Sequence, residues 1–459
     1  MAVIRLHNTL SGEKAVFTPI DPNHVRLYAC GPTVYNFAHV GNARMAVVFD
    51  LLVRVLRQIY PRVTYVSNIT DVDDKIMKVA AESGEAIDTI TRKFERIYNE
   101  DMAALGVASP DIQPRATDHI PEMIALIEAL IARGHAYAAE GHVLFNVPSY
   151  PDYGRLSGRS RDDQVAGARV EIAPYKKDAA DFVLWKPSTA EQPGWNSPWG
   201  RGRPGWHIEC SAMAEKHLGL PFDIHGGGAD LKFPHHENEV AQSCCAHGHD
   251  HDMTQFAKVW VHNGFLTVEN EKMSKSLGNF RLVHDLLAQY PGEVLRLALL
   301  SGHYRQPLDW SESLLEQMKS VLNSMYRTLY DMRDLDAVAP TDIDTVFEAL
   351  CDDLNTPKAI SALNAVNDHA SKNKSPETKG RLLAAGKLLG VLQRDPAVWL
   401  GFGQAQDADE GAAIDVLLQE RQAAKAAKNF KRADEIRNEL SMRGIVIEDT
   451  AAGPQWRRA

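Results

Sequence analysis

The sequence predicts an α/β fold, in which a parallel β-sheet is split by an insertion and followed by a helical bundle and a small C-terminal domain. Three observations support this prediction. The N-terminal part alternates strand-like and helix-like segments, residues 141–205 are rich in Gly, Pro and Trp, and amphipathic helical patterns follow one another from about residue 311. The 459 residues suffice for about two to four domains, each with its own core.

The first half of the sheet begins with a β-rich segment at 25–30. A helical pattern covers 43–60 and ends before Pro61, and a second strand-like segment follows at 63–70. Strand, helix and strand in this order form a βαβ unit, whose right-handed crossover places the two strands parallel in one sheet.

The second half of the sheet is separated from the first by the insertion. A helix is predicted at 121–134, and the loop-rich stretch with short strands comes after it. Strand-like apolar segments return at 222–230 and 258–266. We therefore divide the chain into a first half of the catalytic-type sheet domain (1–120), an insertion (121–215), a second half of the sheet domain (216–310), a helical bundle (311–400) and a small C-terminal domain (405–459).

Composition and charge exclude several classes of protein. The N-terminus has no apolar run of the length that a secretory signal needs, and the apolar stretch 45–56 is broken by Asp50 and Arg54, so no membrane span is expected. Five cysteines are too few for a disulfide framework in this length. We expect a cytoplasmic protein that makes no use of a membrane. The net charge of −10 argues against indiscriminate coating of nucleic acid.

The C-terminal region is more basic than the rest, because residues 420–459 contain nine Lys or Arg and six Asp or Glu. Arg421, Lys425, Lys428 and Arg432 have the spacing of one helical face. This face is either a solvated helix surface or a surface that follows nucleic-acid phosphates.

Two segments have the composition of phosphate-binding elements. His39-Val-Gly41-Asn42 lies where the first predicted helix begins, and free N–H groups at a helix N-terminus bind anions. A purely structural helix cap is the alternative. The segment Lys272-Met-Ser-Lys275-Ser, followed by Gly, suits a mobile loop that holds polyphosphate and stabilises a leaving pyrophosphate.

A third group has the residue types of a zinc site. His235 and Glu239 are four residues apart on a helix predicted to begin after Pro234, and Cys30 and Cys210 could complete the set. The alternative is that the cysteines pack in the core and His235 caps a helix or contacts phosphate. Other candidate ligands nearby are His225, His236, Glu237, Cys244 and Cys245, of which the two adjacent cysteines are expected to pack.

The glycine-rich segment 225–230 ends a predicted strand. In open parallel sheets ligands bind at the carboxyl ends of strands, where glycines admit a base or ribose and Asp230 could accept a ribose hydroxyl.

Together these motifs resemble those of class I aminoacyl-tRNA synthetases and, more closely, the cysteinyl-tRNA synthetase family. The resemblance extends through the whole chain and rests on residues 30–44, 68–76, 202–213, 225–239, 271–280, 352–359 and 444–458. It implies a Rossmann-like sheet split by an insertion, followed by a helical bundle and a small C-terminal domain that bind the anticodon.

The resemblance also assigns residues. It implies a zinc site of Cys30, Cys210, His235 and Glu239. It implies catalytic roles for His39, Asn42, Lys272 and Lys275. It implies substrate contacts for Gly31, Thr33, Asn68, Thr70 and Trp206, and nucleotide contacts for His39, Gly41, Asn42, Gly228, Asp230 and Lys275. Asn42 stands where the family usually has histidine, so it can donate a hydrogen bond but carry no charge.

The implied activity is that of a cysteine–tRNA ligase. ATP, with Mg²⁺, activates L-cysteine to cysteinyl-adenylate, and the cysteinyl group passes to the terminal adenosine of tRNA(Cys). One Zn²⁺ per chain would select the substrate thiolate over the serine hydroxyl. A monomer is expected. The alternatives are an ATP-dependent cysteine:amino-sugar ligase of the same fold and a non-catalytic zinc protein that binds nucleotide or RNA.

Overall fold

A computed structural model describes residues 2–159, 174–273, 278–341, 345–402, 408–450 and 453–458. The chain divides into two compact units. The first unit comprises Met1–Leu314 and Thr345–Ile360, and the second comprises Leu315–Asp344 and Ser361–Ala459. Within the described residues, no helix combines the length and apolarity that crossing a bilayer requires.

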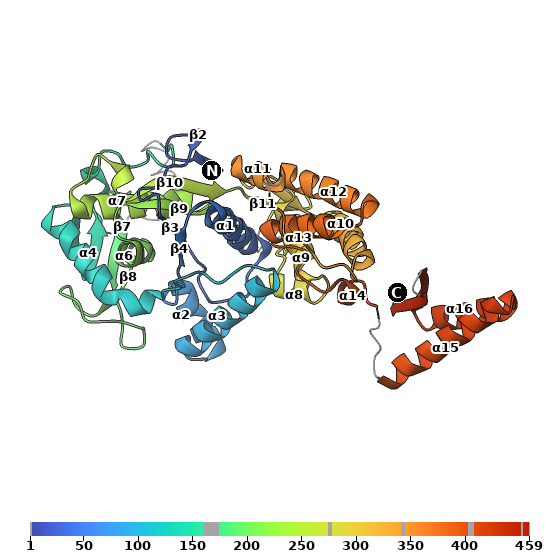
Figure 1. The fold of residues 1–459 in the computed structure, drawn as a ribbon. Coiled ribbons are helices and arrows are strands. Elements are labelled where there is room, and N and C mark those ends of the chain that lie inside the picture. Colours follow the sequence, from blue (N-terminus) through green and yellow to red (C-terminus); the bar gives the residue numbers. More distant parts are fainter. Residues whose placement is uncertain are drawn as a thin grey trace. The chain divides into compact units, whose positions relative to one another are not determined.

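A four-stranded parallel sheet forms the centre of the first unit (Figure 1). Its spatial order is β10–β9–β3–β4, and every neighbouring pair is parallel. The strands are β3 (His24–Ala29), β4 (Arg62–Ser67), β9 (Phe222–Gly228) and β10 (Ala257–Asn263). The predicted strands are therefore confirmed, and both halves of the sequence contribute to one sheet.

Helices cover both faces of this sheet (Figure 1). Helix α1 (Val40–Ile59) connects β3 to β4, and α7 (Glu237–His247) lies in the connection from β9 to β10. These connections run in opposite directions across the sheet, so right-handed crossovers place α1 and α7 on opposite faces. The strand order reverses between β3 and β9, and the carboxyl ends of these two strands form the crevice where such sheets bind ligands.

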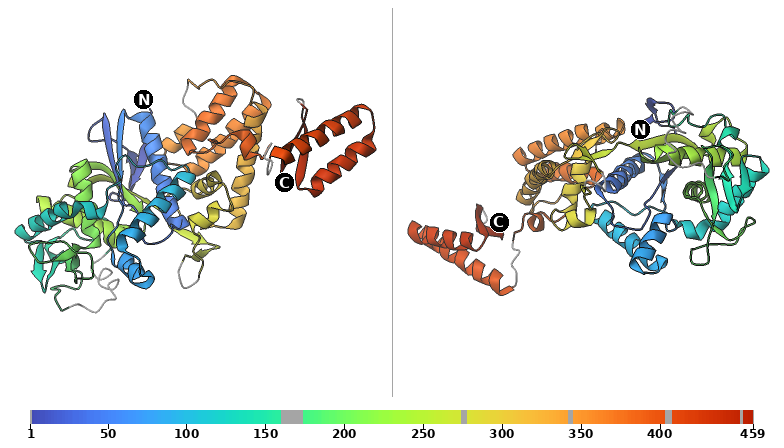
Figure 2. Two further views of the ribbon diagram at one scale, coloured as in Figure 1. Left: turned by 90° about the horizontal axis from the view of Figure 1, so that it is seen from below. Right: turned by 180° about the vertical axis from the view of Figure 1, so that it is seen from behind.

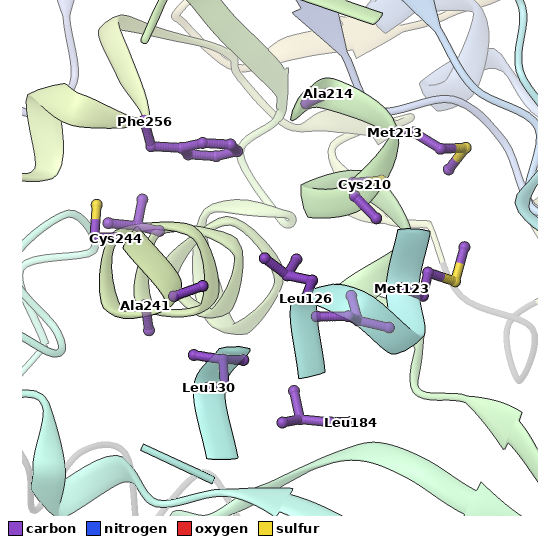
Figure 3. Packing of buried hydrophobic residues seen from close by; sticks show 14 of the residues in the cluster. Met123, Leu126, Leu130, Leu184, Cys210, Met213, Ala214, Ala241, Cys244 and Phe256 are labelled. Carbon is purple, nitrogen blue, oxygen red and sulfur yellow. The ribbon is translucent and has the colours of Figure 1, made fainter. Parts of the chain in front are cut away.

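The insertion forms an antiparallel sheet of its own, with the order β5–β6–β7–β8. Its strands are β5 (Ala136–Ala139), β6 (His142–Phe145), β7 (Phe182–Pro187) and β8 (Gly202–Pro204). It shares a hydrophobic cluster with α4 (Ile120–Ala132), α6 (Trp206–Leu218) and α7. Figure 3 shows residues of these helices gathered in this cluster, among them Leu126, Cys210 and Ala241.

Shorter elements complete the first unit. Strands β1 (Arg5–Asn8) and β2 (Glu13–Val16) form a hairpin, and β11 (Leu266–Val268), β12 (Glu271–Lys272) and β13 (Leu308–Trp310) form a small sheet. The further helices are α2 (Asp74–Ser83), α3 (Ile87–Ala104), α8 (Val283–Leu287), α9 (Gly292–Leu300) and α11 (Thr345–Cys351). Single turns are η1 (Ala116–His119), η2 (Val147–Ser149), η3 (Lys232–His236) and η4 (Met253–Gln255).

The second unit is mainly helical, as predicted from the amphipathic patterns (Figure 2). It contains most of α10 (Glu312–Asp331) and α12 (Thr356–Lys372), followed by α13 (Pro376–Leu389) and α14 (Pro396–Trp399). At its C-terminus, α15 (Ala408–Ala426) and α16 (Phe430–Met442) pack with the antiparallel pair β14 (Ile445–Thr450) and β15 (Gly453–Arg458). Their small core consists of Ile414, Leu418, Ile436, Leu440, Ile445 and Trp456.

The predicted continuous basic face in this region is wrong. Helix α15 ends at Ala426, and Lys428 lies in the following turn with φ +58°, so Arg432 belongs to a different helix, α16. Arg421 is 5% exposed, and its guanidinium donates to both carboxylate oxygens of Asp449, at 2.7 and 3.1 Å. Lys425 donates to the same carboxylate, and Arg432 donates to Glu420. Most of this basic charge is therefore paired within the unit.

Candidate active site

Four metal-ligating side chains meet below the carboxyl ends of β3 and β9. Cys30 follows β3, Cys210 lies on α6, His235 on η3 and Glu239 on α7, and their donor atoms are all within 4.8 Å of one another. Cys30 Sγ is 3.7 Å from Cys210 Sγ and 3.4 Å from Glu239 Oε1, which is 3.1 Å from His235 Nε2. All four residues are buried. The predicted set therefore converges in space.

The local structure around His235 differs from the predicted helix. Phe233 has extended backbone angles, η3 is a single irregular turn, and α7 begins only at Glu237. His235 thus lies before the helix that carries Glu239. The turn and the helix still bring the imidazole of His235 and the carboxylate of Glu239 together, as we predicted from their spacing of four residues.

The chemistry of this cluster suits a metal ion. Burial raises the pKa values of the Cys30 and Cys210 thiols and lowers the pKa of His235 to about 3, so without a cation these three groups are held neutral. Sulfur, imidazole nitrogen and carboxylate oxygen are donors that zinc accepts together. The donors also surround a buried carboxylate, whose charge a cation would compensate.

A second possible set shares Cys30 and Glu239 and adds His225 and His236. His225 Nε2 hydrogen-bonds Glu239 Oε2 at 2.7 Å, whereas Cys30 faces the other carboxylate oxygen, Oε1. The ring of His236 hydrogen-bonds that of His262 at 2.8 Å. His225 therefore also has the arrangement of an outer partner that orients a ligand, whereas His236 hydrogen-bonds none of the candidate ligands in the part of the chain that the structure describes.

The remaining rival ligands have other contacts. Glu237 accepts hydrogen bonds from the backbone N–H groups of Gly154 and Ser157, at 2.9 and 2.8 Å, and so joins α7 to the insertion. Cys244 and Cys245 are buried in the hydrophobic cluster, as expected.

Two residues of this region were missed by sequence reasoning. His207 hydrogen-bonds the Nδ1 atom of His235 at 2.9 Å, and the buried Glu209 accepts from Thr70 Oγ at 2.9 Å. Both residues lie in the same turn of α6 as Cys210. The signal that could have identified them is the presence of polar residues in a mostly buried segment. Trp206, which was predicted, stacks on His235 with ring centroids 4.3 Å apart.

The predicted substrate residues come from the loops after β3 and β4. Gly31 N–H donates to Asn68 Oδ1 at 2.9 Å, and Thr33 pairs with Thr70 through the backbone. A Cβ at position 31 would lie 1.7 Å from the carbonyl oxygen of Asn68, so only glycine fits there. The structure therefore brings these residues together beside the donor cluster, since Cys210 Sγ is 3.6 Å from Asn68 Oδ1.

The first predicted phosphate-binding motif forms a helix cap. His39 is the N-cap of α1, its ring accepts from Gly41 N–H at 3.1 Å, and Asn42 Oδ1 accepts from His39 N–H at 3.1 Å. The N–H of Val40 donates to Arg281 O at 3.0 Å. In this structure the chain's own acceptors therefore occupy the N–H groups of this first turn, as in the structural cap that was the alternative, and the phosphate-binding role of the motif stays a prediction.

The second predicted phosphate-binding motif borders the first. Lys272 ends β12, whereas Lys275 lies outside the described residues. A Cβ on Gly41 would be 3.4 Å from Met273 Cε, and Val283 N–H donates to Ala38 O at 2.9 Å. Both flanks of the lysine-containing loop thus contact the start of α1.

At the end of β9, the carboxylate of Asp230 lies against Gly228, where a Cβ would be 2.3 Å from Asp230 Oδ1. Burial lowers the pKa of His39, and the negative charge of Asp230 opposes this shift. The start of α1, the described flanks of the second motif and the glycine-rich turn therefore lie near one another.

A parallel sheet of this order, in a chain that carries the sequence motifs at 39–42 and 272–276, is typical of a class I aminoacyl-tRNA synthetase, and the family model matched over residues 16–320 shows this class. The solved structures agree on the fold. A Mycobacterium tuberculosis methionyl-tRNA synthetase in complex with methionyl-adenylate matches with a TM-score of 0.58 and 15% identity, over 85% of this chain and 96% of that chain. Agrobacterium radiobacter K84 LeuRS, in a ternary complex, matches with a TM-score of 0.56 and 12% identity, over 81% of this chain and 83% of that chain.

The comparisons at sequence level identify the family. The family model "tRNA synthetases class I (C) catalytic domain" matches residues 16–320, "DALR domain" matches 345–394 and "Cysteinyl-tRNA ligase anticodon binding domain" matches 407–457. The cysteine–tRNA ligase of Parvibaculum lavamentivorans is 58% identical over 99% of this chain and 98% of that protein. That of Rhodospirillum rubrum is 57% identical over 99% of this chain and 100% of that protein. The chain belongs to the cysteinyl-tRNA synthetase family.

Proposed function

We propose that this protein is a cysteine–tRNA ligase, which joins L-cysteine to tRNA(Cys) at the expense of ATP. The observation that carries the proposal is the full-length similarity to cysteine–tRNA ligases, at 57–58% identity, together with the donor cluster beside the nucleotide crevice. A synthetase of this kind has its substrates in the cytoplasm, and we expect it to act there as a monomer.

In this proposal Cys30, Cys210, His235 and Glu239 hold one zinc ion at the base of the crevice, and His225 and His207 orient the ligands. Zinc supplies selectivity when bound, because it takes a thiolate far better than a serine hydroxyl at neutral pH. Packing alone discriminates such similar side chains by only about 1–3 kcal/mol.

The remaining residues act by positioning. Gly31, Thr33, Asn68, Thr70 and Trp206 surround the cysteinyl part, and Gly228 and Asp230 receive the adenosine. The cysteine carboxylate attacks the α-phosphorus of ATP and pyrophosphate leaves, with Mg²⁺ bound to the nucleotide. His39, Gly41, Asn42, Lys272 and Lys275 hold the phosphates in line and stabilise the charge that develops.

The second step transfers the cysteinyl group to a hydroxyl of the terminal adenosine of tRNA. In our domain assignment, residues 311–400 and 405–459 recognise the anticodon side of tRNA, and the anticodon binding domain model matched at 407–457 supports this role for the second of the two. Because the predicted basic face is largely paired internally, this role rests on the family match and not on a continuous positive surface.

Two reactions of the intact chain and of a chain ending before residue 405 test the proposal. We expect both proteins to catalyse cysteine-dependent ATP–pyrophosphate exchange, and only the intact chain to charge bulk tRNA with radiolabelled cysteine. Exchange without charging by the intact chain would favour the amino-sugar ligase. Absence of exchange in the folded protein would favour a non-catalytic role.

A further inference from the structure

A second group of metal-ligating side chains lies at the C-terminal end of α7. It consists of His135, between α4 and β5, Cys245 in the last turn of α7, and Asp250, which follows the helix after Gly248. Their donor atoms are all within 4.8 Å of one another, and His135 Nε2 is 3.3 Å from Asp250 Oδ2. None of these residues belongs to the cluster around Cys30.

The hydrogen bonds of His135 fix which ring nitrogen faces the group. Ser149 Oγ donates its single proton to Asn146 O at 2.6 Å, so it accepts from His135 Nδ1 at 2.9 Å. In the neutral imidazole the proton is therefore on Nδ1, and Nε2 carries a lone pair. A partner that holds one nitrogen and directs the other outward is the usual outer contact of a histidine ligand.

The lone pair of Nε2 faces the carboxylate of Asp250, which is also an acceptor. Two acceptors at 3.3 Å repel each other unless a proton or a cation lies between them. The other carboxylate oxygen, Asp250 Oδ1, is buried and has no hydrogen-bond partner within the residues that the structure describes. The arrangement thus calls for a proton or a cation between His135 Nε2 and the carboxylate of Asp250.

Cys245 supplies the third donor from a fully buried position. On metal binding its S–H bond would break, with the proton released to solvent and the sulfur bound as thiolate. Thiolate and carboxylate together match the two charges of a zinc ion, so the filled site would be neutral, which suits the burial of His135 and Cys245 beside the partly exposed Asp250. The surrounding sequence, Cys244-Cys245-Ala-His-Gly-His-Asp250-His, has the composition of a metal-binding tract.

We propose that His135, Cys245 and Asp250 form a second zinc site, which joins the end of α7 to the start of the insertion sheet. Three protein donors leave a fourth position for water or another ligand. The alternative occupant of the same space is a proton on His135 Nε2, paired with Asp250.

The zinc content of the protein after dialysis against a zinc buffer distinguishes a bound zinc ion from a proton at this position. We would measure it, by mass spectrometry of the metal, for the full chain and for the variants Cys245→Ser, Asp250→Asn and Cys244→Ser. Cys244 is the matched control, because it is as buried as Cys245 but lies outside the donor group. We expect Cys245→Ser and Asp250→Asn to bind about one zinc ion per chain fewer than the wild type and Cys244→Ser.

The comparison does not depend on the first site, because Cys30, Cys210, His235 and Glu239 are unchanged in all four proteins. If the first site held no zinc, the difference between Cys245→Ser and Cys244→Ser would remain. Equal zinc content in all four proteins would overturn the second site and favour the protonated histidine. Loss of zinc in Cys245→Ser alone, with full retention in Asp250→Asn, would also overturn it, because the carboxylate is a required ligand.

Discussion

The carboxylate of Glu239 has a different set of neighbours on each oxygen. Oε1 faces Cys30 and His235 at 3.4 and 3.1 Å, whereas Oε2 is hydrogen-bonded to His225 at 2.7 Å. His225 in turn stacks on Trp260, with ring centroids 4.5 Å apart. The side chain is therefore held with one oxygen directed at the donor cluster, which is the preorganisation that a selective metal site needs.

At this scale the substitution Cys210→Ser tests the donor cluster. We expect it to lose both the zinc bound at this cluster and cysteine-dependent pyrophosphate exchange. Each loss should exceed the roughly 10–100-fold decrease in metal affinity or activity that follows when a residue hydrogen-bonded to a metal ligand is replaced. Cys351→Ser, at a buried cysteine on α11, is the control and should retain both. Wild-type exchange by a folded protein freed of zinc would contradict the assignment.

Helix α1 is joined to distant segments through one arginine. The fully buried guanidinium of Arg44 donates to the carbonyl groups of Gly264 and Phe265 at 2.8 and 2.7 Å, and of His303 and Gln306 at 3.3 and 2.7 Å. Burial lowers its pKa to about 10. The planar fork of donors thereby connects α1, whose N-cap is His39, to the segment that leads into β11.

The substitution Arg44→Lys tests this connection. A single ammonium group cannot reach carbonyls on two segments at once, and each buried acceptor left unpaired costs about 1–3 kcal/mol. We expect the free energy of unfolding to fall by more than about 2 kcal/mol in denaturant titrations. Arg57→Lys, whose half-exposed side chain pairs with Asp111, should lose less than about 1 kcal/mol. Equal losses in the two variants would contradict the argument.

At the scale of the whole molecule, the two units differ in how they are stabilised. The first unit has a large apolar core, whereas the C-terminal part of the second has a core of few residues, beside which Asp449 forms ion pairs with Arg421 and Lys425. Hydrogen bonds from Arg421 and Lys425 hold the pKa of Asp449 well below its usual value. A lowered folded-state pKa stabilises the fold above the unfolded pKa of about 3.9, and this contribution is lost as the pH falls.

We therefore expect Asp449→Asn to destabilise the α15–α16 region at pH 7 by about 0.2–1 kcal/mol, because the carboxylate is half exposed. The difference from the wild type should shrink as the pH is lowered from about 5 toward 2. Hydrogen exchange of the α15 amides in both proteins over this pH range measures this difference in stability. Glu439→Gln on α16 is the control, and a difference that grows on acidification would contradict the sign.

Local sequence determined much of this protein. The strands at β3, β4, β9 and β10 and the helix α1 were predictable because apolar periodicity and Pro61 act over a few residues. The motif residues that identify the family are likewise contiguous, so the fold class and the activity followed from the chain alone. The individual roles of the site residues remain predictions.

Tertiary structure decided which candidate donors converge. Cys30 and Cys210 are far apart in the sequence and meet because α6, which carries Cys210, packs against β3. It also decided that His39 and Asn42 cap α1, and that Arg421 on α15 is paired with Asp449 on β14. These outcomes depend on contacts between distant segments, and residue spacing carries no information about which distant partner a polar group will meet.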